Sequence, residues 1–193
     1  MKKIIFGLLI SAFFFSGCAF GTRKPVLSYT PILALDEAKN IAIYIKPFED
    51  NRTEQSVIGH VRNGYGMKTA KVVTESSVSD WATNAIKTEL TNSGYKIVEE
   101  READLNAVGE ILSVYCDSYL SYEGKVMLGF LLKRGEEILI DKKYSGEASA
   151  LNVLASSKGY GSTLEKALQD VIRQIVNDIN WKLKNSESET IKN

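Results

Sequence analysis

Two cysteines and one histidine are the side chains with the most distinctive chemistry in this 193-residue sequence. A cysteine thiolate is a strong nucleophile that can be alkylated, and a histidine can transfer protons near neutral pH. His60 has neither a neighbouring cysteine nor a Gly-x-Ser-x-Gly motif to work with, so we expect it to be solvated in a polar loop. A single histidine also excludes multi-histidine metal sites. The sequence therefore predicts no enzymatic activity, no metal and no bound cofactor.

The first cysteine, Cys18, follows a segment with the layout of a secretory signal. Residues 1–17 carry two lysines after Met1, continue through an apolar run of about twelve residues, too short to span a bilayer, and end in two small residues. The sequence Phe15-Ser16-Gly17-Cys18 resembles the lipobox of bacterial lipoproteins, with Phe15 where that family prefers leucine. The alternative is an ordinary signal peptide followed by an incidental cysteine.

The lipobox resemblance implies a covalent lipid on Cys18, by which the protein is anchored to a membrane. Two or more acyl chains hold a protein on a membrane where one chain does not. Ala19 stands where an aspartate would, by resemblance to proteobacterial lipoproteins, mean retention at the inner membrane. We therefore expect the protein to be anchored in the outer membrane and to face the periplasm. Residues 18–40 contain a glycine and two prolines without a sustained period, which predicts a flexible linker that reaches about 25 Å.

Residues 41–184 predict a single domain in which strands precede and follow a helix. Residues 78–94 carry an apolar stripe at helical spacing, with Ser77 placed to cap the first turn and Asp80 three residues on. Alternating or β-branched apolar residues predict strands around this helix. We expect strands at residues 41–46, 70–74 and 95–99, and a polar, glycine-bearing loop at residues 50–66.

Three longer strands and a long helix complete the predicted domain. The strands are expected at residues 104–116, 125–134 and 137–148, with hairpin turns at residues 121–124 and 134–136. Ser162 and Glu165 form a capping box before an apolar stripe that keeps a helical period to Leu183, and residues 185–193 form a polar tail. The fold class is α+β: a mainly antiparallel or mixed sheet of about six strands, with both amphipathic helices on one face.

Two polar stretches are candidates for a partner-binding loop. Asp50, Asn51 and Arg52 follow the first strand, and Gly59 and Arg62 lie in the glycine-bearing loop. The alternative for the first stretch is a turn in which the side chains bond to their own backbone. The second stretch lacks the ending of a phosphate-binding P-loop, so a mobile partner-binding loop is the better interpretation.

Three further features have an ordinary structural interpretation beside a functional one. Residues 158–162 precede the last predicted helix and could receive an anion, although Ser162 is expected to occupy that place as the cap. Cys116 is expected to be buried and inert. Five aromatic residues would line a groove for a lipid or glycan, or else form part of the core: Trp81, Tyr115, Tyr119, Tyr122 and Phe130.

Several of these features together resemble a known family. The features that carry this resemblance are Asp50-Asn51-Arg52 after a strand, Val57-Ile58-Gly59, the helix at residues 78–94, Tyr95-Lys96-Ile97, the three later strands and the last helix. Together with the lipobox, they look like the YajG-type outer-membrane lipoproteins. That resemblance implies no enzymatic activity and no cofactor. Residues 41–99 are also similar to the periplasmic domain of CsgG-type curli secretion lipoproteins, but nothing corresponds to their pore-forming hairpins.

The balance of charge and the resemblance together favour a non-catalytic role. Equal numbers of basic and acidic residues, 24 of each, leave no excess for binding nucleic acid. We expect a periplasm-facing binding or structural module in envelope maintenance or assembly, with an envelope protein as partner and with oligomers allowed. The alternatives are a lipid-transport accessory with an apolar groove and a component of a secretion assembly. An envelope hydrolase that uses Asp50 or Glu110 ranks last.

Overall fold

Strand β6 (Leu105–Ser118) is the centre of the sheet in the computed structural model, which describes residues 21–152 and 156–190. One edge of β6 pairs along its whole length with the antiparallel strand β7 (Ser121–Arg134), which pairs in turn with β8 (Glu137–Leu151). The other edge pairs in succession with three short parallel strands: β1 (Ala42–Ile45), β2 (Glu49–Asp50) and β3 (Val57–Arg62). The remaining elements are β4 (Lys68–Val73), which pairs with β3, β5 (Lys96–Ile97), which pairs with β1, and the short 3₁₀-helix η2 (Glu100–Glu102).

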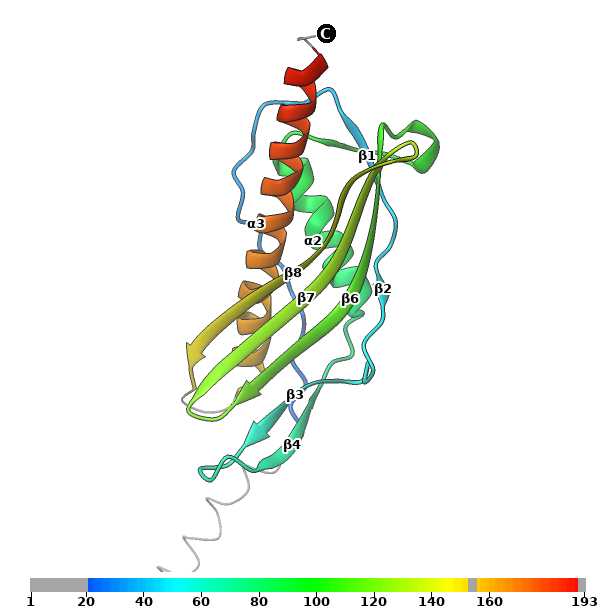
Figure 1. Cartoon of the computed structure of the whole chain (residues 1–193). Coiled ribbons are helices and arrows are strands. Elements are labelled where there is room, and N and C mark those ends of the chain that lie inside the picture. Colours follow the sequence, from blue (N-terminus) through cyan, green and yellow to red (C-terminus); the bar gives the residue numbers. More distant parts are fainter. Residues whose placement is uncertain (1–20, 153–155, 191–193) are drawn as a thin grey trace, which may run out of the picture.

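Two helices, α2 (Val78–Asn92) and α3 (Ser157–Thr190), cover one face of this sheet side by side (Figure 1). The alternating inward residues of β6, β7 and β8 pack against the apolar stripe of α3, which includes the fully buried Leu168, Ile172 and Ile179. Gly146 on β8 lets α3 come close, because a Cβ there would overlap the carbonyl oxygen of Ala167. The opposite face of the sheet carries no helix in the described part of the chain.

The predicted fold class is confirmed: the described residues form an α+β fold with a mixed sheet and two helices on one face. The sheet has eight strands among these residues, two more than the sequence predicts. The additional strands are β2 and β3, which lie within or beside the segment expected to be a loop. The prediction of a loop at residues 50–66 is therefore wrong for residues 57–62, which form β3.

Gly59 explains why β3 does not look like a strand in the sequence. Val57, Ile58 and Val61 are buried, but the register shifts between Val57 and Gly59, so the period of two is broken. Gly59 lies directly against the backbone of Cys116 on β6, where a Cβ would overlap the carbonyl oxygen. The glycine that suggested a mobile loop thus permits a close strand contact.

The turn between β6 and β7 is also displaced from its predicted place. Residues 121–124 were expected to form it, but they belong to β7, and the connection is at Tyr119 and Leu120. Gly124 is needed for another reason, because a Cβ at this position would press on Thr163 of α3.

Helix α3 begins five residues before the predicted cap. Ser156 precedes the helix and its hydroxyl accepts a hydrogen bond from the N–H of Gly159 at 3.2 Å, as an N-cap does. Ser162 lies inside the helix, where its hydroxyl donates to the carbonyl oxygen of Gly159. The capping role predicted for Ser162 is wrong, because the helix already begins at Ser157. Gly159 does not break the helix, and it lies against the ring of Tyr122. The helix also continues through most of the expected polar tail, to Thr190.

Residues 21–40 form a strap across the body of the protein, in contrast to the flexible linker that the sequence predicts. The fully buried carboxylate of Glu89 on α2 accepts hydrogen bonds from the N–H groups of Ile32 and Leu33 and from the hydroxyl of Tyr29, at 2.6–3.0 Å. The indole of Trp81 donates to the carbonyl oxygen of Ser28 at 2.7 Å. The strap has no period of its own, because side chains of another element fix its backbone.

Candidate functional site

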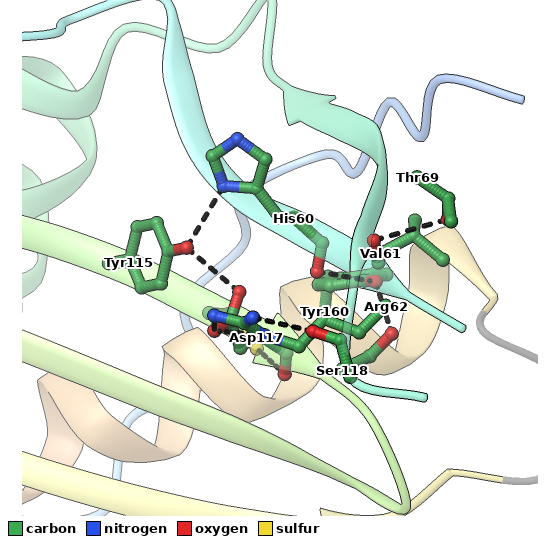
Figure 2. A network of polar contacts seen from close by, with 10 residues as sticks. His60, Val61, Arg62, Thr69, Tyr115, Asp117, Ser118 and Tyr160 are labelled. Atoms are coloured by element: carbon green, nitrogen blue, oxygen red, sulfur yellow. Dashed lines mark hydrogen bonds and ion pairs between the residues drawn. The ribbon is translucent and has the colours of Figure 1, made fainter. Parts of the chain in front are cut away.

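A polar network joins β3 to the end of β6 (Figure 2). The Arg62 guanidinium donates to one carboxylate oxygen of Asp117 at 2.6 and 2.8 Å. The hydroxyl of Tyr115 donates to the other carboxylate oxygen at 2.8 Å, and Nδ1 of His60 lies 2.9 Å from that hydroxyl. Since the hydroxyl proton goes to Asp117, Nδ1 of His60 is the donor to Tyr115.

A buried hydroxyl pair supports this network from the helix side. Tyr160, in the first turn of α3, is fully buried, and its hydroxyl lies 2.5 Å from the hydroxyl of the equally buried Ser118. The Tyr160 hydroxyl also lies 3.3 Å from the carbonyl oxygen of His60, to which it donates. Burial raises the pKa of Tyr160 to about 12, so this hydroxyl keeps its proton at neutral pH. These contacts connect β3, β6 and α3 at one point.

The electrostatics of the network favour fixed hydrogen bonds over proton transfer. Burial and the nearby charge of Lys68 lower the pKa of His60, so the imidazole is predominantly neutral at pH 7. Burial and the bond to Asp117 raise the pKa of the Tyr115 hydroxyl well above its usual value. Both carboxylate oxygens of Asp117 already accept hydrogen bonds, one from Arg62 and the other from Tyr115. The arrangement is suited to holding strands together and to recognition.

A shallow depression of about 490 Å³ adjoins the network on the face of the sheet that carries no helix. Tyr115 and Asp117 form one side of it, and outward residues of β7 and β8 form the rest. Lys125 and Glu147 pair across β7 and β8 at 2.7 Å within this lining. A lining of paired charges on a flat sheet offers polar contacts to another molecule without an enclosed cavity.

The sequence-predicted residues Asp50, Asn51 and Arg52 form a separate corner beside the middle of β6. Arg52 makes a bidentate contact with Asp50 at 2.7 and 2.8 Å, and the side chain of Arg52 is 5% exposed, too little to meet a partner. Burial would raise the pKa of Asp50, but the pairing with Arg52 outweighs it and the pKa is lowered. The side chain of Asn51 donates to Glu110 at 3.0 Å. This corner has the locally bonded turn geometry that was the alternative interpretation.

Gly59 and Arg62 lie on β3 and not in a mobile loop, so the five predicted residues do not form one site. Gly59 contacts the backbone of β6, and Arg62 is part of the network. The expectation of a solvated His60 is wrong, because His60 lies on a strand and is bonded to Tyr115. Cys18, the predicted lipidation site, lies outside the described residues.

The aromatic residues considered for a groove are divided between core and surface. Trp81, Tyr122 and Phe130 are buried, whereas Tyr115 and Tyr119 lie at least partly at the surface. They do not line a single apolar groove between the sheet and the helices. Cys116 is fully buried, as expected, and burial followed by the charge of Asp117 raises the pKa of its thiol to about 12, which makes it unreactive.

Sequence reasoning missed Glu89 and the grouping of Tyr115 with Asp117. Glu89 falls on the apolar stripe of its helix, three residues after Ile86, and a carboxylate on such a stripe is a signal for a buried partner. Tyr115 and Asp117 alternate with Cys116 and so share one face of β6. The pairing of Arg62 with Asp117 could not be predicted, since it depends on a register between β3 and β6 that the sequence does not display.

The described residues contain neither a candidate metal site nor a helix that could span a membrane. No group of three or more histidine, cysteine, aspartate or glutamate side chains in residues 21–152 and 156–190 is arranged to hold a metal ion. Neither helix in these ranges is apolar enough over the required length to cross a bilayer.

Comparisons with known proteins identify a shared fold. No family model and no curated protein sequence matches this chain. Among solved structures, it is similar to a Xanthomonas campestris protein of the DUF330 family, with a TM-score of 0.62 and 13% identity over 88% of this chain and 98% of that chain. It is also similar to an uncharacterized protein, with a TM-score of 0.53 and 8% identity over 82% and 99% of the two chains.

A more distant similarity is to a minor lipoprotein from Acinetobacter baumannii, with a TM-score of 0.44 and 12% identity over 72% of this chain and 91% of that chain. At this TM-score the similarity carries no argument about function. The first two structures show that the same fold occurs in other proteins, and the identities are too low to transfer a role.

Proposed function

We propose that this chain is a lipoprotein held on the periplasmic face of the outer membrane by acyl chains on Cys18. In that position it acts as a non-catalytic binding or structural module in envelope maintenance or assembly. The observation that carries the proposal is the sequence Phe15-Ser16-Gly17-Cys18 directly after an apolar segment of signal-peptide length. The resemblance to YajG-type lipoproteins supports the same role.

The backbone contacts of Arg23 with β4 fit a short tether between Cys18 and the folded body. The N–H of Arg23 donates to the carbonyl oxygen of Lys71 at 3.1 Å, and the N–H of Val73 donates to the carbonyl oxygen of Arg23 at 2.9 Å. Arg23 is only five residues after Cys18. A lipid on Cys18 would therefore hold the body close to the bilayer and would not let it range over the distance that a long linker allows.

The site geometry supports binding and not catalysis. In the network at β3 and β6, the carboxylate of Asp117 is paired with Arg62 and Tyr115, and the thiol of Cys116 is buried. The adjoining depression is open and lined by paired charges. A surface of this kind can contact another envelope protein without changing it chemically.

Metabolic labelling with palmitate tests the anchor. The wild-type protein and a Cys116→Ala variant are expected to incorporate label equally, because Cys116 is buried and does not carry the lipid. A Cys18→Ala variant is expected to incorporate none and to leave the membrane fraction. Label that persists in Cys18→Ala would contradict the proposal.

A further inference from the structure

Large apolar side chains are exposed together at one end of the molecule. We call this the tip surface, and its members come from the β3–β4 turn, the β6–β7 turn and the end of β8. Tyr65 is 89% exposed, Leu120 74% and Leu151 87%. The complete set is Tyr65, Met67, Tyr119, Leu120 and Leu151. Apolar residues gathered in this way on a surface mark a contact with another phase or molecule.

Hydrogen bonds hold the parts of the tip surface together. The hydroxyl of Tyr119 donates to the carbonyl oxygen of Gly64 at 2.9 Å, which joins the β6–β7 turn to the β3–β4 turn. Leu151 pairs with Ser121, the residue that follows the β6–β7 turn. Arg62 donates to the carbonyl oxygen of Gly66 at 2.8 Å as well as to Asp117. The network of Figure 2 therefore braces the β3–β4 turn against β6.

The entry of the chain lies beside this same end. Arg23 pairs in parallel with Val72 on β4, so Gly21 and Thr22, which precede it, run in the direction of Lys68 and the tip surface. Arg23 is the fifth residue after Cys18, and five extended residues span at most about 18 Å. Whatever path those residues take, a lipid on Cys18 holds the β4 end of the body near the bilayer.

The composition of the tip surface suits the boundary between headgroups and acyl chains. Two tyrosines present an apolar ring with a polar hydroxyl, a combination enriched at membrane interfaces. Leucine and methionine supply apolar area, and the exposed Lys68 follows Met67 directly. A protein partner or a second copy could also cover an apolar patch, but only a bilayer is brought to this end by the anchor.

From this geometry we infer that the tip surface inserts into the interface of the bilayer that holds the Cys18 lipid, and so fixes the orientation of the body. The inference rests on the proposed lipid anchor. The long strands and α3 run from this end to the opposite one (Figure 1). Ile138, at the start of β8, and Trp181, in the C-terminal part of α3, are exposed. With the tip surface in the membrane, β6–β8 stand away from the bilayer and present that far end to the periplasm.

Fluorescence quenching by brominated lipids tests the inference on the full lipidated protein. The protein is reconstituted in phosphatidylcholine vesicles whose acyl chains are brominated close to the glycerol, and compared with the same protein in unbrominated vesicles. Tyr65→Trp places a reporter on the tip surface, and Ile138→Trp places a matched reporter at the far end. Both positions are exposed, so the fold tolerates the change, and the wild-type emission is subtracted to remove Trp81 and Trp181.

The emission added by Tyr65→Trp is expected to fall by about half or more in brominated vesicles, and that added by Ile138→Trp to stay unchanged. Flotation of the vesicles reports the anchor separately. Protein that floats while the Tyr65→Trp emission is unquenched overturns this inference alone, whether the reporter then faces solvent or a second copy of the chain. Protein that does not float overturns the lipid anchor as well.

Discussion

The N-terminal and C-terminal halves of the domain are positioned by different kinds of contact. In the C-terminal half, β6, β7 and β8 form long antiparallel ladders with one register shift each, and the apolar stripe of α3 covers their inner face. In the N-terminal half, β1, β2 and β3 each pair with β6 over only two or three residues. Polar side chains also position this half: Asp50 pairs with Arg52 beside β2, Asp117 pairs with Arg62 of β3, and Glu89 holds the strap.

This difference predicts different responses to substitution. Where an apolar stripe covers a long ladder, removing apolar volume lowers the free energy of unfolding of the whole domain, in proportion to the volume removed. A short strand held by a buried charge or by a close backbone contact loses its local position first. Four measurements can test this contrast between the two halves, ordered from the largest expected effect to the smallest.

Truncating the stripe of α3 is expected to have the largest effect. Ile172 is fully buried against the sheet, and Ile172→Ala should lower the free energy of unfolding by about 4 kcal/mol, through lost burial and the cavity that remains. Urea unfolding followed by circular dichroism measures the loss, with the exposed Arg173→Ala as the control. A loss under about 1 kcal/mol would mean that α3 does not hold the sheet in the way described.

Removing the buried carboxylate of Glu89 is expected to have the next largest effect. Glu89→Ala leaves the N–H groups of Ile32 and Leu33 and the hydroxyl of Tyr29 without their acceptor, at a cost of about 3 kcal/mol. Hydrogen exchange should accelerate at those two amides more than in β7. Glu89→Gln keeps one acceptor oxygen and should lose less. Equal protection in the Ala variant and the wild type would show that Glu89 does not hold the strap.

Adding a methyl group at Gly59 is expected to displace β3. The Cβ of Gly59→Ala overlaps the carbonyl oxygen of Cys116, which should cost about 2 kcal/mol and loosen the pairing of β3 with β6. Gly64→Ala is the matched control, because no atom lies within 4 Å of a Cβ there. The contrast between the two variants in thermal unfolding is the measurement. Identical midpoints would remove the argument for a close strand contact.

The smallest expected effect is a pH dependence at His60. Burial and Lys68 lower its pKa in the folded protein, so as the pH falls through about 6.5 the unfolded chain binds a proton more readily than the folded one. The folded state should therefore lose a little stability between pH 7 and pH 5. NMR titration is direct, because His60 is the only histidine.

The midpoint of that titration should lie below 6.5 in the folded protein and near 6.5 in urea. The charge of Asp117 partly offsets the lowering, so Asp117→Asn should move the midpoint further down. A folded midpoint at or above the unfolded one would contradict the described surroundings of the imidazole.

The same contrast explains how much of the fold the sequence predicts. The α3 stripe from Leu164 to Leu183 and the alternation in β7 repeat with a regular period, because a single continuous surface buries them. The strap has no such period, since its backbone is bonded to Glu89 and Trp81 of another element. Gly59, Gly124 and Gly159 were interpreted as loop or turn residues, although each marks a close contact between elements.

The candidate site was predictable only in part for a related reason. Arg62 was identified from its position in a polar stretch, but its partners Tyr115 and Asp117 lie more than fifty residues away. Pairing of β3 with β6 through a register shift brings them together. The resemblance of residues 15–18 to a lipobox, by contrast, is a local signal and needs no tertiary structure to be recognised.

The intact mass of the protein purified from the outer-membrane fraction tests the central proposal most directly. The account predicts a chain that begins at Cys18 and carries the added mass of a diacylglyceryl group and an amide-linked acyl chain. A protein that is recovered without lipid, from the soluble periplasmic fraction and with its N-terminus at another residue, would contradict the anchor and the proposed role together.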